Sequence, residues 1–314
     1  MQDAWLLSGI DEGERLSKPQ GTRIFSVGPY MLFESPRSRV HMQERMKDSH
    51  LELFPVSPRV IYGKAPLIRV ICQLRFPPLL SIESKQPVEF QERVRDRFPY
   101  LEKLGAALPP DVPQEVVKII QAQVGSHNYQ FLTEDRSAAV TLAPDSLSLT
   151  TSKYSRWEHF REILRIPLAA LMDIYRPNFF SRIGLRYQDA IDRSKLGLED
   201  RPWSHLIRRE VLGELSLSYF EDNLEGVLNR TIRLKIPDGS GSILMRHGLG
   251  AVAERGELCY MVDIDLFDER RTEAANAEEI LNHFNEIAGR AFRWCISDTL
   301  RDALEPRDLA DSAG

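Results

Sequence analysis

The sequence contains little cysteine and no long apolar run. Its three cysteines, Cys72, Cys259 and Cys295, lie far apart, each in an apolar stretch, within a chain of 314 residues. This pattern is typical of reduced thiols in a hydrophobic core, so we expect neither a disulfide nor a zinc site. No apolar run approaches the roughly 20 residues of a membrane-spanning helix, and the first residues lack the basic and apolar regions of a secretory signal. We therefore expect a cytoplasmic protein with no membrane partner.

Positive charge and catalytic motifs are also scarce. The 41 Lys and Arg residues are outnumbered by 46 Asp and Glu, which gives a net charge of −5 at pH 7. Such a chain has no global field that attracts a phosphate backbone, so we do not expect nucleic acid as a partner. The chain contains no Gly-Lys-Ser/Thr, no Gly-x-Ser-x-Gly and no two histidines at i, i+4 spacing. The absence of these phosphate, nucleophile and zinc motifs favours a protein without catalytic residues or a cofactor.

The first part of the folding region begins with an alternating strand pattern over 67–76, which Pro77 ends. A helix then opens at Pro87, and its apolar stripe extends to Leu101. Turn residues next separate three short strands, predicted at 127–133, 138–142 and 147–151. A second helix follows, and the spacing of Ser155 and Glu158 predicts a capping box at its start.

The second part repeats this order of elements. A strand is predicted over 180–188 and a helix over 203–215. Three strands follow, predicted at 224–236, 242–249 and 257–267. The closing helix begins at a second capping-box spacing, Asn276 and Glu279, and is expected to run to Leu304.

The repeated order predicts an α+β protein built from two pseudo-repeated halves, each made of a strand, a helix, three antiparallel strands and a helix. A local echo supports this interpretation, because Leu-Arg-Phe around Arg75 matches Leu-Arg-Tyr around Arg186. The halves are expected to form two lobes with a groove between them. The predicted segments are a disordered extension or misassigned start at 1–45, the halves at 53–176 and 177–305, and a polar tail at 306–314.

Three stretches of the chain resemble an uncharacterised family of sporadically distributed prokaryotic proteins. They are Ala65-Pro-Leu-Ile-Arg-Val-Ile-Cys-Gln-Leu-Arg-Phe-Pro-Pro, Arg182-Ile-Gly-Leu-Arg-Tyr and Ala291-Phe-Arg-Trp-Cys-Ile-Ser-Asp-Thr-Leu-Arg-Asp-Ala-Leu. The resemblance covers roughly 53–306. It implies an accessory component of a mobile locus, such as a defence or toxin–antitoxin locus. Since the family has no assigned activity, it implies no catalytic residue.

Arg75 and Arg186 form the first candidate site. If the halves are duplicated, both arginines occupy one pseudo-symmetric position, where two guanidinium groups could clamp a phosphate or carboxylate. The alternative is that each forms a structural ion pair with a neighbouring carboxylate. Trp157 and Trp203 lie on helical stripes and are expected either to line the same cleft or to pack in the core.

Asp263 and Asp265 form the second candidate site, because they share one face of a strand. Together with Glu269 they could hold Mg²⁺ or Mn²⁺ through oxygen ligands. The alternative is a solvated sheet face with cross-strand partners such as Arg233, Lys235 or Arg246.

These observations favour a non-catalytic binding or regulatory protein that takes a small anionic ligand or a protein partner between its halves. One alternative is a metal-dependent phosphodiester hydrolase that uses Asp263 and Asp265. Another is an obligate subunit of a larger complex. The sequence leaves the oligomeric state open.

Overall fold

The computed structural model describes residues 52–104, 128–217, 219–220, 229–251 and 258–308. The chain divides into two units, Met1–Leu51 and Glu52–Gly314, and the described residues all belong to the second unit. The predicted extension at 1–45 lies outside the described residues. So do the first residues of the strand predicted at 224–236 and the end of the polar tail.

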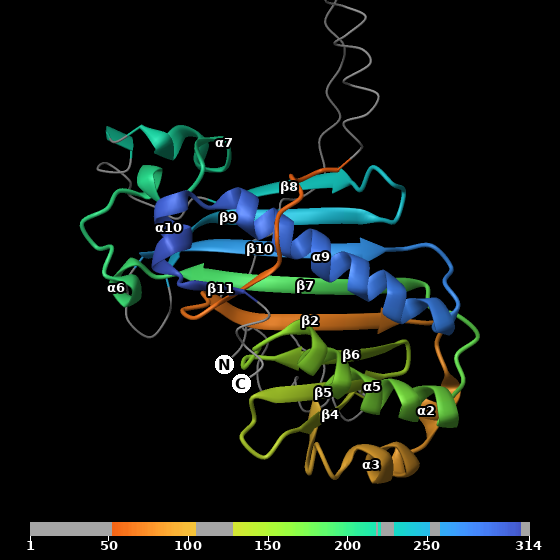
Figure 1. Cartoon of the computed structure of the whole chain (residues 1–314). Coiled ribbons are helices and arrows are strands. Elements are labelled where there is room, and N and C mark those ends of the chain that lie inside the picture. The colour runs from red at the N-terminus through yellow and green to blue at the C-terminus, as the bar shows by residue number, and fades with distance from the viewer. Residues whose placement is uncertain (1–51, 105–127, 218, 221–228, 252–257, 309–314) are drawn as a thin grey trace, which may run out of the picture. The chain divides into compact units, whose positions relative to one another are not determined.

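A sheet of nine antiparallel strands forms the centre of this unit (Figure 1). In chain order its strands are β2 (Leu67–Arg75), β3 (Tyr100–Leu104), β4 (Asn128–Leu132), β5 (Ala138–Ala143), β6 (Ser146–Thr151), β7 (Arg182–Ile191), β8 (Asn229–Lys235), β9 (Ser242–Ala251) and β10 (Leu258–Asp268). In space they follow the order β3-β4-β5-β6-β2-β7-β10-β9-β8. The predicted α+β class and both meanders are therefore confirmed.

The two halves meet where β2 pairs with β7, and we call this pair the seam. The prediction of two lobes with a groove between them is wrong, because the halves share one sheet. The physical reason is that the first strand of each half has two hydrogen-bonding edges. Its own meander satisfies one edge, through β6 or β10, and the first strand of the other half satisfies the second.

The strand order is symmetric about the seam. It reads the same from both sides when β2 is matched with β7, β6 with β10, β5 with β9 and β4 with β8, with β3 added at one edge. This symmetry agrees with an internal duplication. Common descent of the halves stays a prediction, because strand order alone does not establish it.

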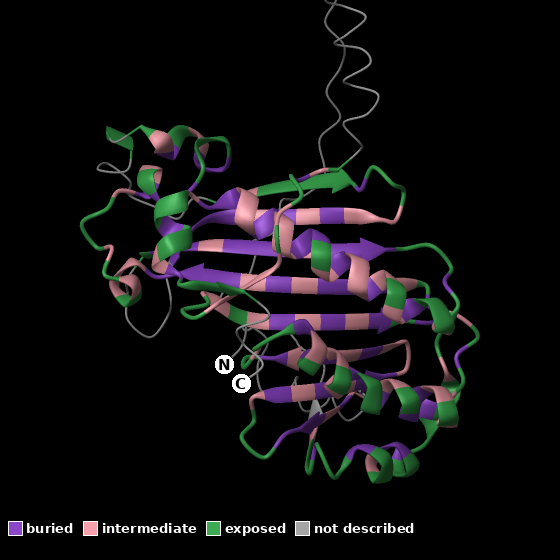
Figure 2. Cartoon of the chain, viewed as in Figure 1, coloured by how far each residue is buried: buried purple, intermediate pink, exposed green. Residues whose placement is uncertain are grey.

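Two long helices cover one face of the sheet. Helix α5 (Trp157–Ile174) packs on the first half and α9 (Ala277–Cys295) on β7 and β10 (Figure 1). Alternate residues of the strands point toward these helices and are buried, as the striped colouring of Figure 2 shows. The predicted stripe of α9 is buried along its length, with Leu281, Phe284, Ala288, Phe292 and Cys295. Among the helices of the described residues, none combines the length and the apolar character that a bilayer crossing requires.

The remaining helices and turns are short. They are α2 (Leu80–Ser84), α3 (Val88–Val94), α6 (Arg193–Leu196), the 3-10 turn η1 (Trp203–His205), α7 (Arg209–Leu212), the 3-10 turns η2 (Gly213–Ser216) and η3 (Ala274–Asn276), and α10 (Asp298–Ala303). Helix α3 packs beside α5. It ends earlier than predicted, and Leu101 belongs instead to β3, where its side chain is exposed.

The continuous helices predicted at 203–215 and up to Leu304 are both broken, and one contact explains both breaks. Ile207 and Ile296 form an isolated β-bridge, which takes their backbone groups out of helical bonding. The closing helix therefore ends at Cys295, and Ser297 caps α10 by accepting a hydrogen bond from the Leu300 amide.

Neither predicted capping box forms. Helix α5 begins after Arg156 and α9 after Asn276, and neither residue makes a side-chain cap. The Glu158 carboxylate is instead bound by Arg59, at 2.6 Å from its Nη1. A tertiary ion pair has thus taken the side chain that the capping box needed.

Residues 52–64, which we call the strap, cross α9 and include β1 (Val60–Tyr62) (Figure 1). This strand pairs with β11 (Pro306–Asp308), so part of the predicted polar tail is a strand. The strap packs Phe54 against Trp294 and Tyr62 against Phe292. It fixes the last turns of α9 above β7 and β10.

Candidate functional site

The sheet face opposite α5 and α9 carries a network of charged side chains, which we call the polar face. It joins Arg182 and Arg186 of β7 to Asp263 and Asp265 of β10, with Arg246 of β9 beside them. Arg186 binds Asp263 with two hydrogen bonds, Nε to Oδ1 at 2.7 Å and Nη2 to Oδ2 at 2.5 Å. Arg182 lies 3.1 Å from Asp265, measured from Nη2 to Oδ2. The bidentate geometry is the strong form of a guanidinium–carboxylate contact.

Burial shapes the electrostatics of this network. The side chains of Asp263 and Asp265 are only 12% and 15% exposed. Burial raises the pKa of Asp265, while the charges of Arg182 and Arg186 act in the opposite direction. Arg246 Nη1 lies 3.6 Å from Asp263 Oδ2 and is buried with no hydrogen-bond partner among the residues that the structure describes. The network therefore depends on both acidic side chains.

The predicted metal site does not form. Asp263 and Asp265 point toward guanidinium groups, and Glu269 pairs with Arg233 at 3.2 Å. The part of the chain that the structure describes contains no group of three or more metal-ligating side chains. The alternative of a solvated face with cross-strand partners is confirmed in the pairing of Arg246 with Asp263, but both aspartates are buried and not solvated. The hydrolase hypothesis gains no support from this geometry.

The structure separates the two arginines of the predicted clamp. Arg75 lies opposite Arg182 in the seam, whereas Arg186 lies opposite Ile71, four residues further along β7. That separation corresponds to about 13 Å along the strands. Arg75 follows Gln73 by two residues, and Arg186 follows Gly184 by two residues, where Gln73 and Gly184 are paired in the seam. Because the strands are antiparallel, the two arginines lie on opposite sides of this pair along the seam. The clamp is therefore wrong, and each arginine binds a carboxylate of its own half, Asp145 or Asp263.

The two candidate tryptophans belong to the core. Trp157 is 3% exposed, stacks on Phe160 and donates from Nε1 to Asn282 Oδ1 at 2.6 Å. Trp203 is 1% exposed and packs against Tyr260. The alternative interpretation as core residues is confirmed for both, and neither lines a cleft.

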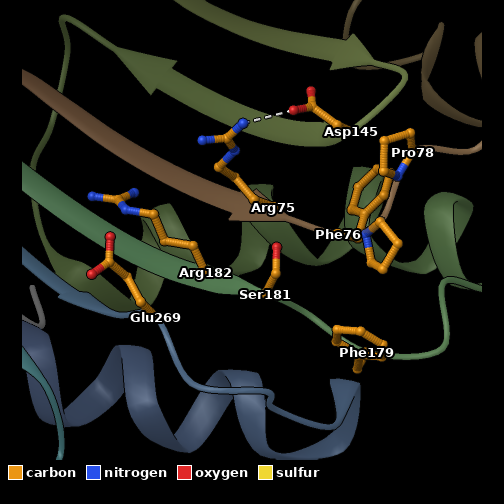
Figure 3. A pocket seen from close by; sticks show the side chains of 9 residues that line it. Arg75, Phe76, Pro78, Asp145, Phe179, Ser181, Arg182 and Glu269 are labelled. Atoms are coloured by element: carbon orange, nitrogen blue, oxygen red, sulfur yellow. Dashed lines mark hydrogen bonds and ion pairs between the residues drawn. The ribbon is translucent and has the colours of Figure 1, made fainter.

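A cleft of about 470 Å³ opens at one end of the seam (Figure 3). Arg75 ends β2, Arg182 begins β7 beside it, and Asp145 lies in the turn between β5 and β6. The Ser181 amide donates to the Arg75 carbonyl oxygen at 2.7 Å, which ties the two strand ends together. The lining residues are Arg75, Phe76, Pro77, Pro78, Asp145, Phe179, Ser181, Arg182 and Glu269.

The Arg75 guanidinium is the more exposed of the two arginines that line this cleft. Its side chain is 50% exposed, and within the described residues it makes a single hydrogen bond, from Nη2 to Asp145 Oδ2 at 2.7 Å. A guanidinium has five N–H donors, so most of those of Arg75 remain for another acceptor. An exposed ion pair of this kind contributes about 0–1 kcal/mol, so a competing anion can replace Asp145 at little cost.

Arg182 is held more firmly on the other side of the cleft. Its Nη1 donates to Gln73 Oε1 at 3.1 Å, its Nη2 faces Asp265, and the guanidinium lies over the Phe267 ring at 5.0 Å. Figure 3 shows Arg75 and Arg182 at neighbouring strand ends, with Ser181 directly before β7 and the Arg182 guanidinium extending toward Glu269. Phe179 and the two prolines add apolar surface, whereas Phe76 is 2% exposed and packs against Phe180. This set of donors and apolar groups suits the binding of an anion.

The lining residues give no sign of nucleophilic catalysis. They include no histidine or cysteine, and among the described residues the Ser181 hydroxyl makes no hydrogen bond to either lining carboxylate. Sequence reasoning identified Arg75 but missed Arg182, Ser181 and Asp145. Arg182 could have been found only from the register of the seam, which places it opposite Arg75.

Comparison with known proteins adds no relative to this picture. No family model matches the chain, and no curated protein matches it. The resemblance to a sporadically distributed prokaryotic family therefore stays a prediction, and the candidate site depends on its own geometry.

Proposed function

We propose that this protein is a non-catalytic binding protein that takes a small anionic ligand in the cleft at the end of the seam. The observation that carries the proposal is the pair Arg75 and Arg182, which arrive from adjacent strand ends and face one hollow. A cleft of about 470 Å³ lies within the usual size range of small-molecule sites.

The other lining groups narrow the class of ligand. Asp145 and Glu269 balance the charges of Arg75 and Arg182, so the lining is formally neutral. A polyanion would meet repulsion from these carboxylates, whereas a single carboxylate or phosphate can bind Arg75 and leave them at the rim. Phe179, Pro77 and Pro78 offer contacts for an apolar or aromatic body. The favoured ligand is thus a small monoanion with an apolar portion.

Calorimetric titration of the full chain with a small panel tests the proposal. The panel contains inorganic phosphate, benzoate, phenyl phosphate and a nucleoside triphosphate as the polyanion. We expect an aromatic monoanion to bind most tightly, and Arg75→Gln to weaken it about tenfold or more, since a hydrogen bond to a charged group contributes about 1.5–3 kcal/mol.

Arg97→Gln is the matched control, because Arg97 is exposed after α3 and lies outside the cleft lining. Its affinity for the same anion should equal that of the unaltered protein. Equal affinity of the Arg75→Gln variant, or no binding of any panel member, would contradict the proposal.

A further inference from the structure

Strand β8 forms an edge of the nine-stranded sheet and is the most exposed of its strands. Within the described residues it pairs with β9 alone. Alternate residues of an antiparallel edge strand direct their backbone N–H and C=O groups away from the sheet. In β8 these groups form a row that can accept one more strand. Figure 2 shows β8 exposed along almost its whole length.

The apolar face of the sheet continues onto β8, where its side chains are partly exposed. Ile232 lies opposite Met245 of β9, and Leu234 lies opposite Ile243. The β9 residues are 4% and 0% exposed, whereas Ile232 and Leu234 are 45% and 36% exposed. An added strand would remove part of this apolar surface from water, which favours its association.

The charge of β8 is of one sign. Its seven residues, Asn-Arg-Thr-Ile-Arg-Leu-Lys, include three cations and no acid. Arg233 and Lys235 share the face opposite Ile232 and Leu234. Arg233 pairs with Glu269, but the two side chains are 59% and 60% exposed, so this contact is weak. Lys235 has no ion-pair partner among the residues that the structure describes.

We infer that β8 is a docking edge for an extended, acidic segment of another protein, which adds to the sheet as a further strand. The backbone row supplies the hydrogen bonds of strand addition. Alternation supplies the specificity, since acidic side chains would face Arg233 and Lys235 while apolar ones cover Ile232 and Leu234.

Charge decides between this partner and a second copy of the chain. Pairing two β8 edges would bring two cation-rich strands together with no acidic residue in either. Like charges across a strand pair are destabilising, and positive side chains on an edge commonly prevent self-pairing. An acidic segment has the opposite relation to the same side chains. Arg233 contacts the lining of the seam cleft through Glu269, whereas Lys235 pairs with no lining residue among those described, so Lys235 is the position that distinguishes the two sites.

Fluorescence anisotropy with two labelled probe peptides tests the inference on the full chain at low salt. One peptide alternates Glu and Val, and the other alternates Lys and Val. We expect the Glu peptide to bind about tenfold more tightly, since two opposite-charge pairs replace two like-charge pairs. The double variant Arg233→Glu/Lys235→Glu should reverse this preference, and the control Arg97→Glu should keep it.

A pair of proline variants tests the strand-addition geometry separately. Thr231 and Ile232 are adjacent, so one directs its N–H toward β9 and the other away from the sheet. Proline at the inward position should lower the melting temperature, whereas proline at the outward position should keep it and abolish peptide binding. Equal loss of peptide binding and equal stability in both variants would contradict strand addition.

Three results would overturn the inference. They are equal binding of both peptides, an unchanged preference in the double charge variant, and a dimer in analytical ultracentrifugation that proline at the outward position of β8 abolishes. The single variants separate this site from the cleft. Arg75→Gln should leave peptide binding unchanged, and Lys235→Glu should leave binding of the small anion unchanged.

Discussion

Buried aspartates have different surroundings on the two faces of the central strands. On the polar face, Asp263 is bound by the Arg186 guanidinium. On the helix-covered face, Asp189 of β7 is 5% exposed and lies within electrostatic range of Cys295 and Tyr62. Burial raises the pKa of Asp189 to about 8, and the negative charge of Asp263 adds to the rise. Burial in apolar surroundings thus lets the Asp189 carboxyl keep its proton to a higher pH than a free side chain does.

A similar contrast separates the arginines of the two halves. Arg186 makes two hydrogen bonds within the polar face, while Arg75 makes one exposed contact at the rim of the cleft. The first arginine pairs within the sheet, and the second keeps N–H donors that the proposed ligand would accept. The difference teaches that equivalent places in a symmetric strand order can serve different purposes.

Removing apolar volume from the helix-covered face should have the largest effect. Leu185 of β7 is fully buried on this face, so Leu185→Ala should lower the free energy of unfolding by about 4 kcal/mol. Urea denaturation measures this change. Gln188→Ala, on the polar face of the same strand, is the control and should cost less than about 1 kcal/mol. Equal costs would contradict the division between the faces.

Breaking the polar network should have the next largest effect. Asp263→Ala leaves Arg186 and the already unsatisfied Arg246 without their carboxylate, and should cost about 3 kcal/mol. The double variant Asp263→Ala/Arg186→Met should recover part of that loss, because it removes the unpaired charge as well. A single variant that unfolds at the same urea concentration as the unaltered protein would show that the network contributes nothing.

The buried Asp189 carboxyl should have a smaller effect on the free energy of unfolding, and this effect should depend on pH. Its pKa is about 8 in the folded chain against 3.8 for a free side chain. Between these values the unfolded chain releases the proton and the folded chain keeps it, so stability should fall as pH rises from about 4 to about 8. Asp189→Asn should remove this slope and raise the free energy of unfolding by about 2 kcal/mol at pH 7, with little change at pH 4. Denaturation curves at several pH values measure the difference, and parallel profiles for the two proteins would refute the neutral carboxyl.

Much of the fold could be predicted from local patterns. Alternation located β2 and both meanders, and helical periodicity located α5 and the buried stripe of α9. The errors came from tertiary contacts that no local pattern records. The bridge between Ile207 and Ile296 broke two helices, and Arg59 bound the Glu158 side chain that was assigned to a cap.

The candidate site was predicted only in part, for a related reason. Arg75 was recognised from an echo of sequence, but its true neighbour depends on the register of β2 against β7. One sequence does not state which strands pair. The prediction therefore joined Arg75 to Arg186 by symmetry, whereas hydrogen bonding between the strands placed Arg182 beside it.

One side-by-side measurement tests the central claim, that Arg75 serves a ligand and Arg186 serves the sheet. Arg75→Gln and Arg186→Gln are each unfolded in urea and titrated with the tightest-binding monoanion of the panel. We expect Arg75→Gln to change stability by less than about 1 kcal/mol and to weaken the anion about tenfold or more. Arg186→Gln should lose about 2 kcal/mol of stability and keep its affinity. The opposite assignment, with binding lost in Arg186→Gln and kept in Arg75→Gln, would contradict the account.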